Sequence, residues 1–170
     1  MESSFPTPHR APLDVFKQAV RHFPLPSINL VVRNAHGEYL FVKRLNNPTK
    51  GEWWVPGGRI LNGETAMEAA RRVLREETGV DISEFVVSSE YIEELWGVDG
   101  FDADDWNNYD PKTSCVHYWA TVAYAELSQE QTIHLDSQSS EARWSAQLLS
   151  DHPGLRQYFE LLERMGVKLI

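Results

Sequence analysis

The chain has 170 residues, 42% of them hydrophobic, which is the size of one globular domain with a single core. Its formal net charge of −9 excludes a general nucleic-acid-binding surface, which needs clustered Lys and Arg, but it does not exclude a nucleotide bound through a metal ion. With a single cysteine, Cys115, and no apolar run long enough to span a membrane, the sequence predicts a cytoplasmic protein without membrane contact.

The N-terminal third predicts an arm, a helix and a set of strands. Residues 1–11 contain two prolines and no periodic pattern, which is typical of a mobile or draped arm, so we expect one domain over residues 12–170. Apolar spacing predicts a helix over residues 13–23, which the following prolines end. Shorter apolar runs predict three strands, at residues 28–32, 39–42 and 53–55.

A well-capped helix is predicted between Thr65 and Gly79. Thr65 and Glu68 have the capping-box spacing, and Gly79 is placed as the left-handed residue that ends a helix. The apolar stripe of this helix passes through Val73 and continues to Glu77. A carboxylate therefore stands where the periodicity requires a core residue.

Two acids, Glu76 and Glu77, lie together in the last turn, where the helix dipole and their mutual repulsion disfavour them. In one interpretation they belong to an exposed ladder of charges in which Arg72 offsets Glu76. In the other they bind a divalent metal. The preceding segment, Pro56-Gly57-Gly58, favours the second interpretation, because glycine lets the backbone approach a ligand and Mg²⁺ takes oxygen ligands.

The C-terminal half predicts three more strands and a final helix. The strands are expected at residues 85–92, 117–124 and 141–144, and the helix at 148–165. Residues 97–111 are acidic and aromatic, and a loop of this length is typical of a substrate lid or of a disordered segment. Strands with helices before, between and after them predict one α/β layered domain.

The capped helix and the turn before it resemble the signature of the Nudix hydrolases, Gly-x5-Glu-x7-Arg-Glu-apolar-x-Glu-Glu-x-Gly-apolar. The chain matches this pattern without a gap at Gly58, Glu64, Arg72, Leu74, Glu76, Glu77, Gly79 and Val80. The one departure is Val73, which stands where the family has its first glutamate after the arginine. The resemblance implies a Nudix-type αβα sandwich with a mixed β-sheet.

Within that family, the chain is similar to the GDP-mannose mannosyl hydrolases, which also lack this glutamate. The similarity extends over residues 24–59 and 134–144. It implies a homodimer that hydrolyses a nucleoside diphosphate sugar with Mg²⁺ or Mn²⁺, through attack of water on the sugar carbon. Two alternatives stay open. One is a pyrophosphatase that attacks phosphorus with Glu76 and Glu77 both on the metal, and the other is a catalytically silent module that binds a nucleotide sugar.

The resemblance also implies the site residues by position. The metal ligands it implies are Gly57, Glu77 and Gln138, with Glu76 beside them. The cationic and orienting groups it implies around the diphosphate are Arg44, Arg59 and Arg72, and the guanidinium fork of arginine suits phosphate oxygens. Tyr118 matches a tyrosine of the mannosyl hydrolases and is expected to contact the substrate.

The general base of these enzymes is a histidine, and this chain has Ser139 in its place. A serine does not take up a proton at neutral pH as histidine does. A different base is therefore expected from His134, Asp136, Glu141 or the acidic segment 97–111. We select Glu141, because other Nudix enzymes often place an acid three residues before the tryptophan of this strand. The alternative role of Glu141 is an exposed charge at a strand end.

Overall fold

The computed structural model describes residues 7–46, 49–97 and 115–169. In chain order, the elements are α1 (Leu13–His22), β1 (Leu25–Asn34), β2 (Tyr39–Arg44), β3 (Trp53–Trp54), β4 (Gly57–Arg59), α2 (Ala66–Thr78), β5 (Val86–Gly97), β6 (Cys115–Leu127), β7 (Ser139–Ser145) and α3 (Pro153–Arg164). Apart from Gly97, the predicted acidic loop lies outside the described residues, as do residues 1–6 of the predicted arm.

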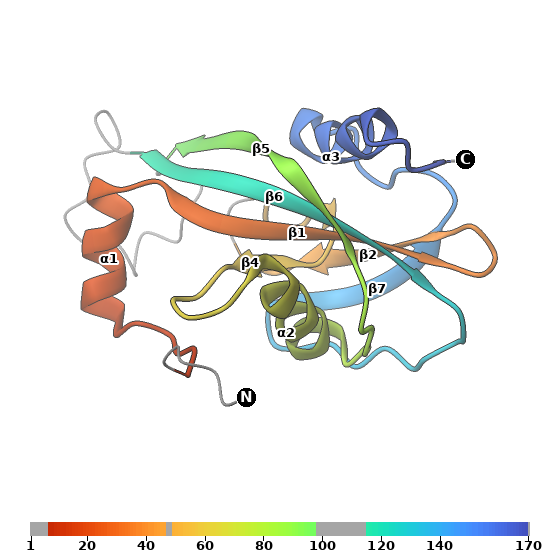
Figure 1. Cartoon of the computed structure of the whole chain (residues 1–170), viewed down its shortest axis with the longest axis horizontal. Helices are drawn as coiled ribbons and strands as arrows, with labels where there is room; N and C mark the ends of the chain where they lie inside the picture. Colours follow the sequence, from red (N-terminus) through yellow and green to blue (C-terminus); the bar gives the residue numbers. More distant parts are fainter. Residues whose placement is uncertain (1–6, 47–48, 98–114, 170) are drawn as a thin grey trace.

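A mixed sheet forms the centre of the molecule (Figure 1). β1 and β6 pair in parallel, whereas the other strand pairs are antiparallel. The strand order is β3-β2-β1-β6-β5, with β4 added to β1 and β7 added to β2. Because β4 pairs with the first half of β1 and β2 pairs with the second half, the strands diverge beside α2.

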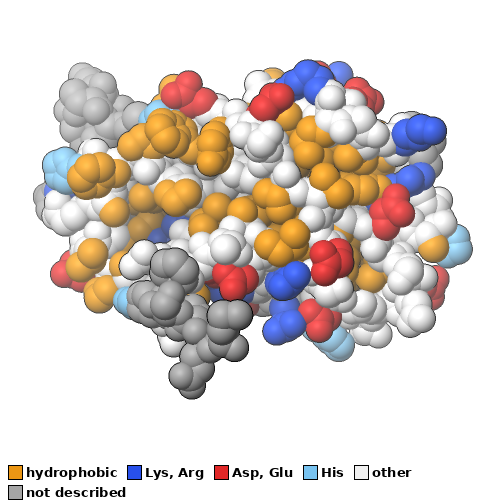
Figure 2. Space-filling view, viewed as in Figure 1, with side chains coloured by type: hydrophobic (Ala, Val, Ile, Leu, Met, Phe, Trp, Pro, Cys, Tyr) orange, Lys and Arg blue, Asp and Glu red, His pale blue; other side chains and the backbone are white. Residues whose placement is uncertain are grey.

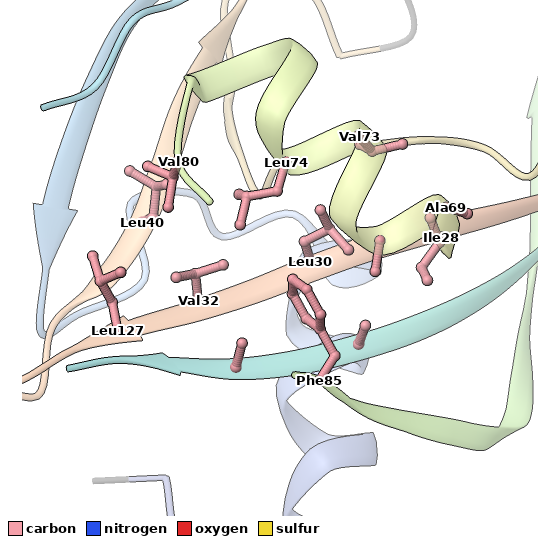
Figure 3. Packing of buried hydrophobic residues seen from close by; sticks show 13 residues of the cluster. Ile28, Leu30, Val32, Leu40, Ala69, Val73, Leu74, Val80, Phe85 and Leu127 are labelled. Atoms are coloured by element: carbon pink, nitrogen blue, oxygen red, sulfur yellow. The ribbon is translucent and has the colours of Figure 1, made fainter. Parts of the chain in front are cut away.

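The side chains of β1 alternate between two cores, as a strand buried on both faces requires. Ile28, Leu30 and Val32 pack with α2, and Figure 3 shows them beneath this helix. Val31 points to the other face and packs with Tyr158 of α3. Helices therefore cover both faces of the sheet, which confirms the predicted αβα sandwich.

The sequence predicted the ends of α2 correctly. The Thr65 hydroxyl accepts from the Glu68 N–H at 3.2 Å, and the Glu68 carboxylate accepts from the Thr65 N–H at 2.7 Å. Gly79 has a φ of +70°, a left-handed conformation that glycine adopts at little cost. These caps fix where the last turn, with its two acids, lies against the sheet.

Several other boundaries differ from the prediction: β1, β6 and β7 begin earlier and end later than expected, and β4 was not predicted. β5 continues to Gly97, beyond its expected end at Ile92, because it stays paired with β6 as far as Cys115. α3 begins at Pro153, where the ring nitrogen of His152 accepts from the Gly154 N–H at 3.1 Å. The longer β5 places additional side chains beside the site described below.

Several large apolar side chains stay exposed on α1, β5 and β6. They are Leu13, Val15, Val86, Tyr91, Leu95 and Trp119, together with Phe23 at the end of α1. In the view of Figure 1, Figure 2 shows hydrophobic side chains gathered over these elements. None of the helices in the described part of the chain is long and apolar enough to cross a membrane.

Candidate active site

A cavity of about 240 Å³ lies where α2 and β4 meet the diverging strands. Its lining includes eight of the nine predicted site residues: Arg44, Gly57, Arg59, Arg72, Glu76, Glu77, Tyr118 and Gln138. Glu141 is not part of the lining, and its carboxylate lies 3.2 Å from Nζ of Lys43. The pairing of β7 with β2 sets Glu141 opposite Lys43, and this long-range register is not readable from the sequence.

Glu77 is one of the acids set into the cavity wall. Its Oε2 accepts from the Gly57 N–H at 3.2 Å. Burial raises the pKa of Glu77 to about 7, and the neighbouring Asp136 carboxylate contributes to this rise, whereas Arg44 opposes it. The cavity therefore holds a carboxylate whose ionised form needs a cation for stabilisation.

Arg72 organises the turn before α2. It donates to both carboxylate oxygens of Glu64, at 2.6 and 2.9 Å, and to the Arg59 carbonyl at 2.8 Å. Its third nitrogen donates to Oε2 of Glu76 at 3.1 Å. The buried Glu64 raises the pKa of Arg72. Arg72 therefore holds both the turn and the Glu76 carboxylate in place, as expected of an orienting residue.

Glu76 differs from Glu77 in its surroundings. Its Oε2 accepts from Arg72 and also from Arg10, which reaches it from the segment before α1 at 2.9 Å. The Glu76 side chain is 44% exposed. This acid is paired with two arginines at the rim of the cavity, so Glu77 is the better placed of the two acids to hold a metal.

Arg59 is held by the helix that precedes the sheet. Its guanidinium carbon lies 3.7 Å from the centre of the Phe16 ring on α1, a cation–π contact. Burial lowers the pKa of Arg59, and burial raises the pKa of Tyr118, which lines the same part of the cavity. α1 therefore positions a cation over the cavity.

The residues present fit a hard divalent cation. The Glu77 carboxylate and the Gln138 amide supply oxygen atoms of the type that Mg²⁺ prefers. Gln138 donates through Nε2 to Asp136 at 2.9 Å, which orients its amide. Within the described ranges, no cluster of three or more His, Cys, Asp or Glu side chains forms a metal site. A shell of this kind is completed by water and substrate phosphate.

The other predicted bases do not line the cavity, although Asp136 lies near Glu77. His134 packs against Gly79, where an added Cβ would lie 3.1 Å from the histidine Cβ. Asp136 accepts two hydrogen bonds from Gln138. Neither residue belongs to the cavity lining, and neither does Ser139.

Several residues of the lining were not predicted as site residues, and two of them, Glu94 and Ser27, carry polar groups that face a ligand-sized space. Glu94 on β5 accepts hydrogen bonds from the Tyr158 hydroxyl and from Asn29, and burial raises its pKa. Ser27 on β1 is buried, and its Oγ has no hydrogen-bond partner among the described residues. A buried hydroxyl of this kind in a cavity wall is available to a ligand.

Known proteins resemble this chain in sequence and in fold. A model of the NUDIX domain family matches residues 24–161. The low-salt glycan biosynthesis protein Agl8 of Haloferax volcanii is 32% identical over 157 residues, which cover 91% of this chain and 92% of that protein. Two solved structures show the same fold.

The first solved structure is the MutT protein from Methanosarcina mazei Go1, with a TM-score of 0.60 and 21% identity over 85% of this chain and 97% of its own. The second is the NUDIX domain of Shewanella oneidensis NrtR complexed with ADP ribose, with a TM-score of 0.57 and 21% identity over 84% of this chain and 88% of its own.

Proposed function

Because the chain belongs to the NUDIX domain family, we propose that it is a Mg²⁺-dependent hydrolase of a nucleoside diphosphate sugar. Members of this family generally use divalent metals such as Mg²⁺. The proposed reaction releases the free sugar and the nucleoside diphosphate, and GDP-mannose is the first substrate to test. Water attacks the sugar carbon in this reaction, and the diphosphate leaves.

The observation that carries this proposal is the pairing of one buried acid with two arginines around a single cavity. Glu77 supplies the carboxylate from α2, whereas Arg44 and Arg59 reach the cavity from β2 and β4. Opposite charges arranged in this way suit a metal ion and the phosphate oxygens that share its shell. The site is thus matched to a diphosphate as a leaving group.

Val73 supports attack on carbon over attack on phosphorus, because it stands where the Nudix signature has a glutamate that the mannosyl hydrolases also lack. This side chain is buried and packs against Gly58, where an added Cβ would lie 3.1 Å from Val73 Cγ2. The pyrophosphatase alternative also needs Glu76 on the metal, but Glu76 is paired with Arg10 and Arg72. These contacts favour one metal, held by Glu77 with Gly57 and Gln138.

The name of the Haloferax relative, a glycan biosynthesis protein, supports a sugar-containing substrate. Trp54 and Trp96 belong to the cavity lining, and the Trp96 indole N–H contacts the Glu94 carboxylate at 3.4 Å. Aromatic faces beside hydrogen-bond acceptors suit the apolar and hydroxyl-bearing sides of a pyranose.

Each group of the site has a proposed role. A bound metal ion would neutralise charge that develops on the leaving diphosphate. Arg44 and Arg59 would hold phosphate oxygens, and Tyr118 would contact the substrate beside Arg59. Arg72 would keep the turn before α2 in place through Glu64. Stabilisation of the leaving group is the main catalytic effect in this arrangement.

Incubation with GDP-mannose and MgCl₂, followed by phosphorus NMR, tests the proposal. GDP as the phosphorus-containing product, with no turnover after EDTA treatment, is the expected result. GMP with mannose 1-phosphate would identify a pyrophosphatase. Unchanged ligand together with Mg²⁺-dependent binding would identify a silent module.

The expectations of a homodimer and of a cytoplasmic location stay predictions. Light scattering coupled to gel filtration measures the oligomeric state, with a mass of twice the chain as the expected result.

A further inference from the structure

We propose that Glu94 is the general base of the reaction, the group that takes the proton from the attacking water. This inference rests on the proposed function, in which water attacks the sugar carbon. It concerns a residue that the Nudix signature does not include, and it gives the chain a base in place of the absent histidine.

The carboxylates of the cavity lining narrow the choice. The acids in this lining are Glu76, Glu77 and Glu94. Glu76 is paired with two arginines, and Glu77 is the proposed metal ligand. Glu94 therefore remains among the described acids of the lining. It is not the proposed metal ligand, and it is not part of an arginine pair like that of Glu76.

Glu94 is fixed in place by three elements. Its Oε1 accepts from the hydroxyl of Tyr158 on α3, and from Nδ2 of Asn29 on β1 at 3.3 Å. Its Oε2 is approached by the Trp96 indole N–H at the longer distance of 3.4 Å. Oε1 is thus the anchored oxygen, and Oε2 has the weaker contact and retains acceptor capacity for a water molecule.

Asn29 lies between Glu94 and the part of the cavity that is proposed to hold the metal. The same side chain that donates to Glu94 also lies against Gly57, because an added Cβ at position 57 would meet Asn29 Oδ1 at 2.5 Å. One asparagine side chain therefore separates Glu94 from the glycine beside Glu77. Glu94 therefore lies one side chain away from the place proposed for the metal and the diphosphate.

The charge around Glu94 suits a base. Burial raises its pKa, while hydrogen bonds from Tyr158 and Trp96 and the charge of Arg44 on β2 lower it. Tyr118 on β6 also faces it. Burial and the Glu94 charge raise the pKa of Tyr158 well above its ordinary value, so this phenol stays a donor. A carboxyl with a raised pKa is better matched to proton transfer near neutral pH.

A lone pair of the water oxygen forms the bond to the anomeric carbon, and the bond from that carbon to the diphosphate oxygen breaks with its electron pair on the departing diphosphate. Glu94 takes one proton from the water and becomes a neutral carboxylic acid. Release of that proton to solvent restores the carboxylate for the next turnover.

The first test compares two substitutions on the same strand. Glu94→Gln keeps the size of the side chain and removes its basicity, so kcat for GDP-mannose hydrolysis is expected to fall about 10²- to 10⁴-fold. Glu93→Gln is the matched control, because Glu93 points to the other side of β5 and lies 2.9 Å from His117. The control is expected to keep the wild-type kcat.

The second test separates a base from a merely structural residue. Azide is already an anion and needs no base, so sodium azide is expected to restore turnover of Glu94→Ala at least tenfold and to give mannosyl azide. Mg²⁺-dependent binding of GDP, measured by calorimetry, is expected to be unchanged in Glu94→Gln. A structural role for Glu94 predicts weaker GDP binding and no azide rescue.

Two outcomes would overturn the proposal: a kcat of Glu94→Gln within threefold of wild type, or the absence of azide rescue in folded Glu94→Ala. If these variants do not fold, Glu94→Asp is tested instead, because it retains the charge on a side chain that is shorter by one methylene. Its kcat is expected to be at least tenfold lower, and a wild-type kcat contradicts the proposal. If the wild-type protein itself releases no sugar, the proposed function fails before Glu94 is tested.

Discussion

The backbone N–H of Gly57 donates to Oε2 of Glu77 over 3.2 Å, so β4 meets the last turn of α2 at a buried carboxylate. A Cβ at position 57 would lie 2.5 Å from Asn29 Oδ1 and 3.1 Å from the Ile28 carbonyl oxygen, so this close approach favours glycine. The contact places an acid where helix periodicity favours an apolar side chain. A bound cation would offset the cost of that placement.

Substitution of Glu77 tests whether it holds the metal. Glu77→Gln removes the charge and keeps the shape, so we expect loss of Mg²⁺-dependent hydrolysis and loss of the rise in melting temperature that Mg²⁺ gives the wild-type protein. Differential scanning fluorimetry across a MgCl₂ titration measures the second effect. Glu84→Gln is the control, since this side chain is 84% exposed. A melting temperature of Glu77→Gln that still rises with Mg²⁺ would remove Glu77 from the metal site.

The raised pKa of Glu77 predicts how stability depends on pH without metal. Its pKa is about 7 in the folded chain, against an ordinary value of 4.5, so the folded state binds more protons than the unfolded state between these values. The stability from this group is fully present below about pH 4.5 and is lost as pH rises through about 7. The shift corresponds to roughly 3 kcal/mol.

Urea denaturation in EDTA, at a series of pH values, measures this effect as the difference between wild type and Glu77→Gln. We expect Glu77→Gln to be the more stable protein at pH 8 and to gain no such advantage at pH 4.5. An equal difference at both pH values would mean that the Glu77 carboxyl is not buried as described.

The Arg72–Glu64 pair predicts a large loss of stability. The Glu64 side chain is 2% exposed and both of its oxygens accept from Arg72. Arg72→Met would leave a buried carboxylate without its cation, so we expect the free energy of unfolding to fall by about 3–5 kcal/mol. Chemical denaturation measures it. The double variant Arg72→Met, Glu64→Leu is expected to lose less than Arg72→Met alone, and an equal or larger loss contradicts the pairing.

The contact of Phe16 with Arg59 predicts that a residue outside the cavity wall affects substrate binding. Its ring lies 3.7 Å from the guanidinium carbon of Arg59, a contact worth about 0.5–2 kcal/mol. Phe16→Ala is therefore expected to raise KM about two- to thirtyfold, with a smaller effect on kcat. Val15→Ala on the exposed side of α1 serves as the control. Steady-state kinetics measure both KM values. Equal KM values for the two variants would mean that α1 does not affect substrate binding.

Local chemistry explains what could be predicted from the sequence. The caps at Thr65 and Gly79 depend on neighbours a few residues away, so the bounds of α2 and the place of Glu77 follow from spacing alone. The ion pair of Arg10 with Glu76 joins residues 66 positions apart and follows from the docking of the N-terminal segment on α2, which no local pattern encodes.

Glu94 was missed for a more specific reason. The irregular pairing of β5 between Val87 and Tyr91 shifts its register, and the expected strand stopped at Ile92. In the structure, Ile92 and Trp96 pack toward the α3 core, and Glu94 lies between them on the same face. This is the signal that identified Glu77, an acid on an apolar face, but it becomes visible only once the strand is followed to its end.

The most direct test of the central claim is hydrolysis of GDP-mannose with MgCl₂ in ¹⁸O-labelled water, with mass spectrometry of both products. Attack on the sugar carbon predicts ¹⁸O in mannose and none in GDP. Label in a phosphate group would contradict the account, because water would then have attacked phosphorus.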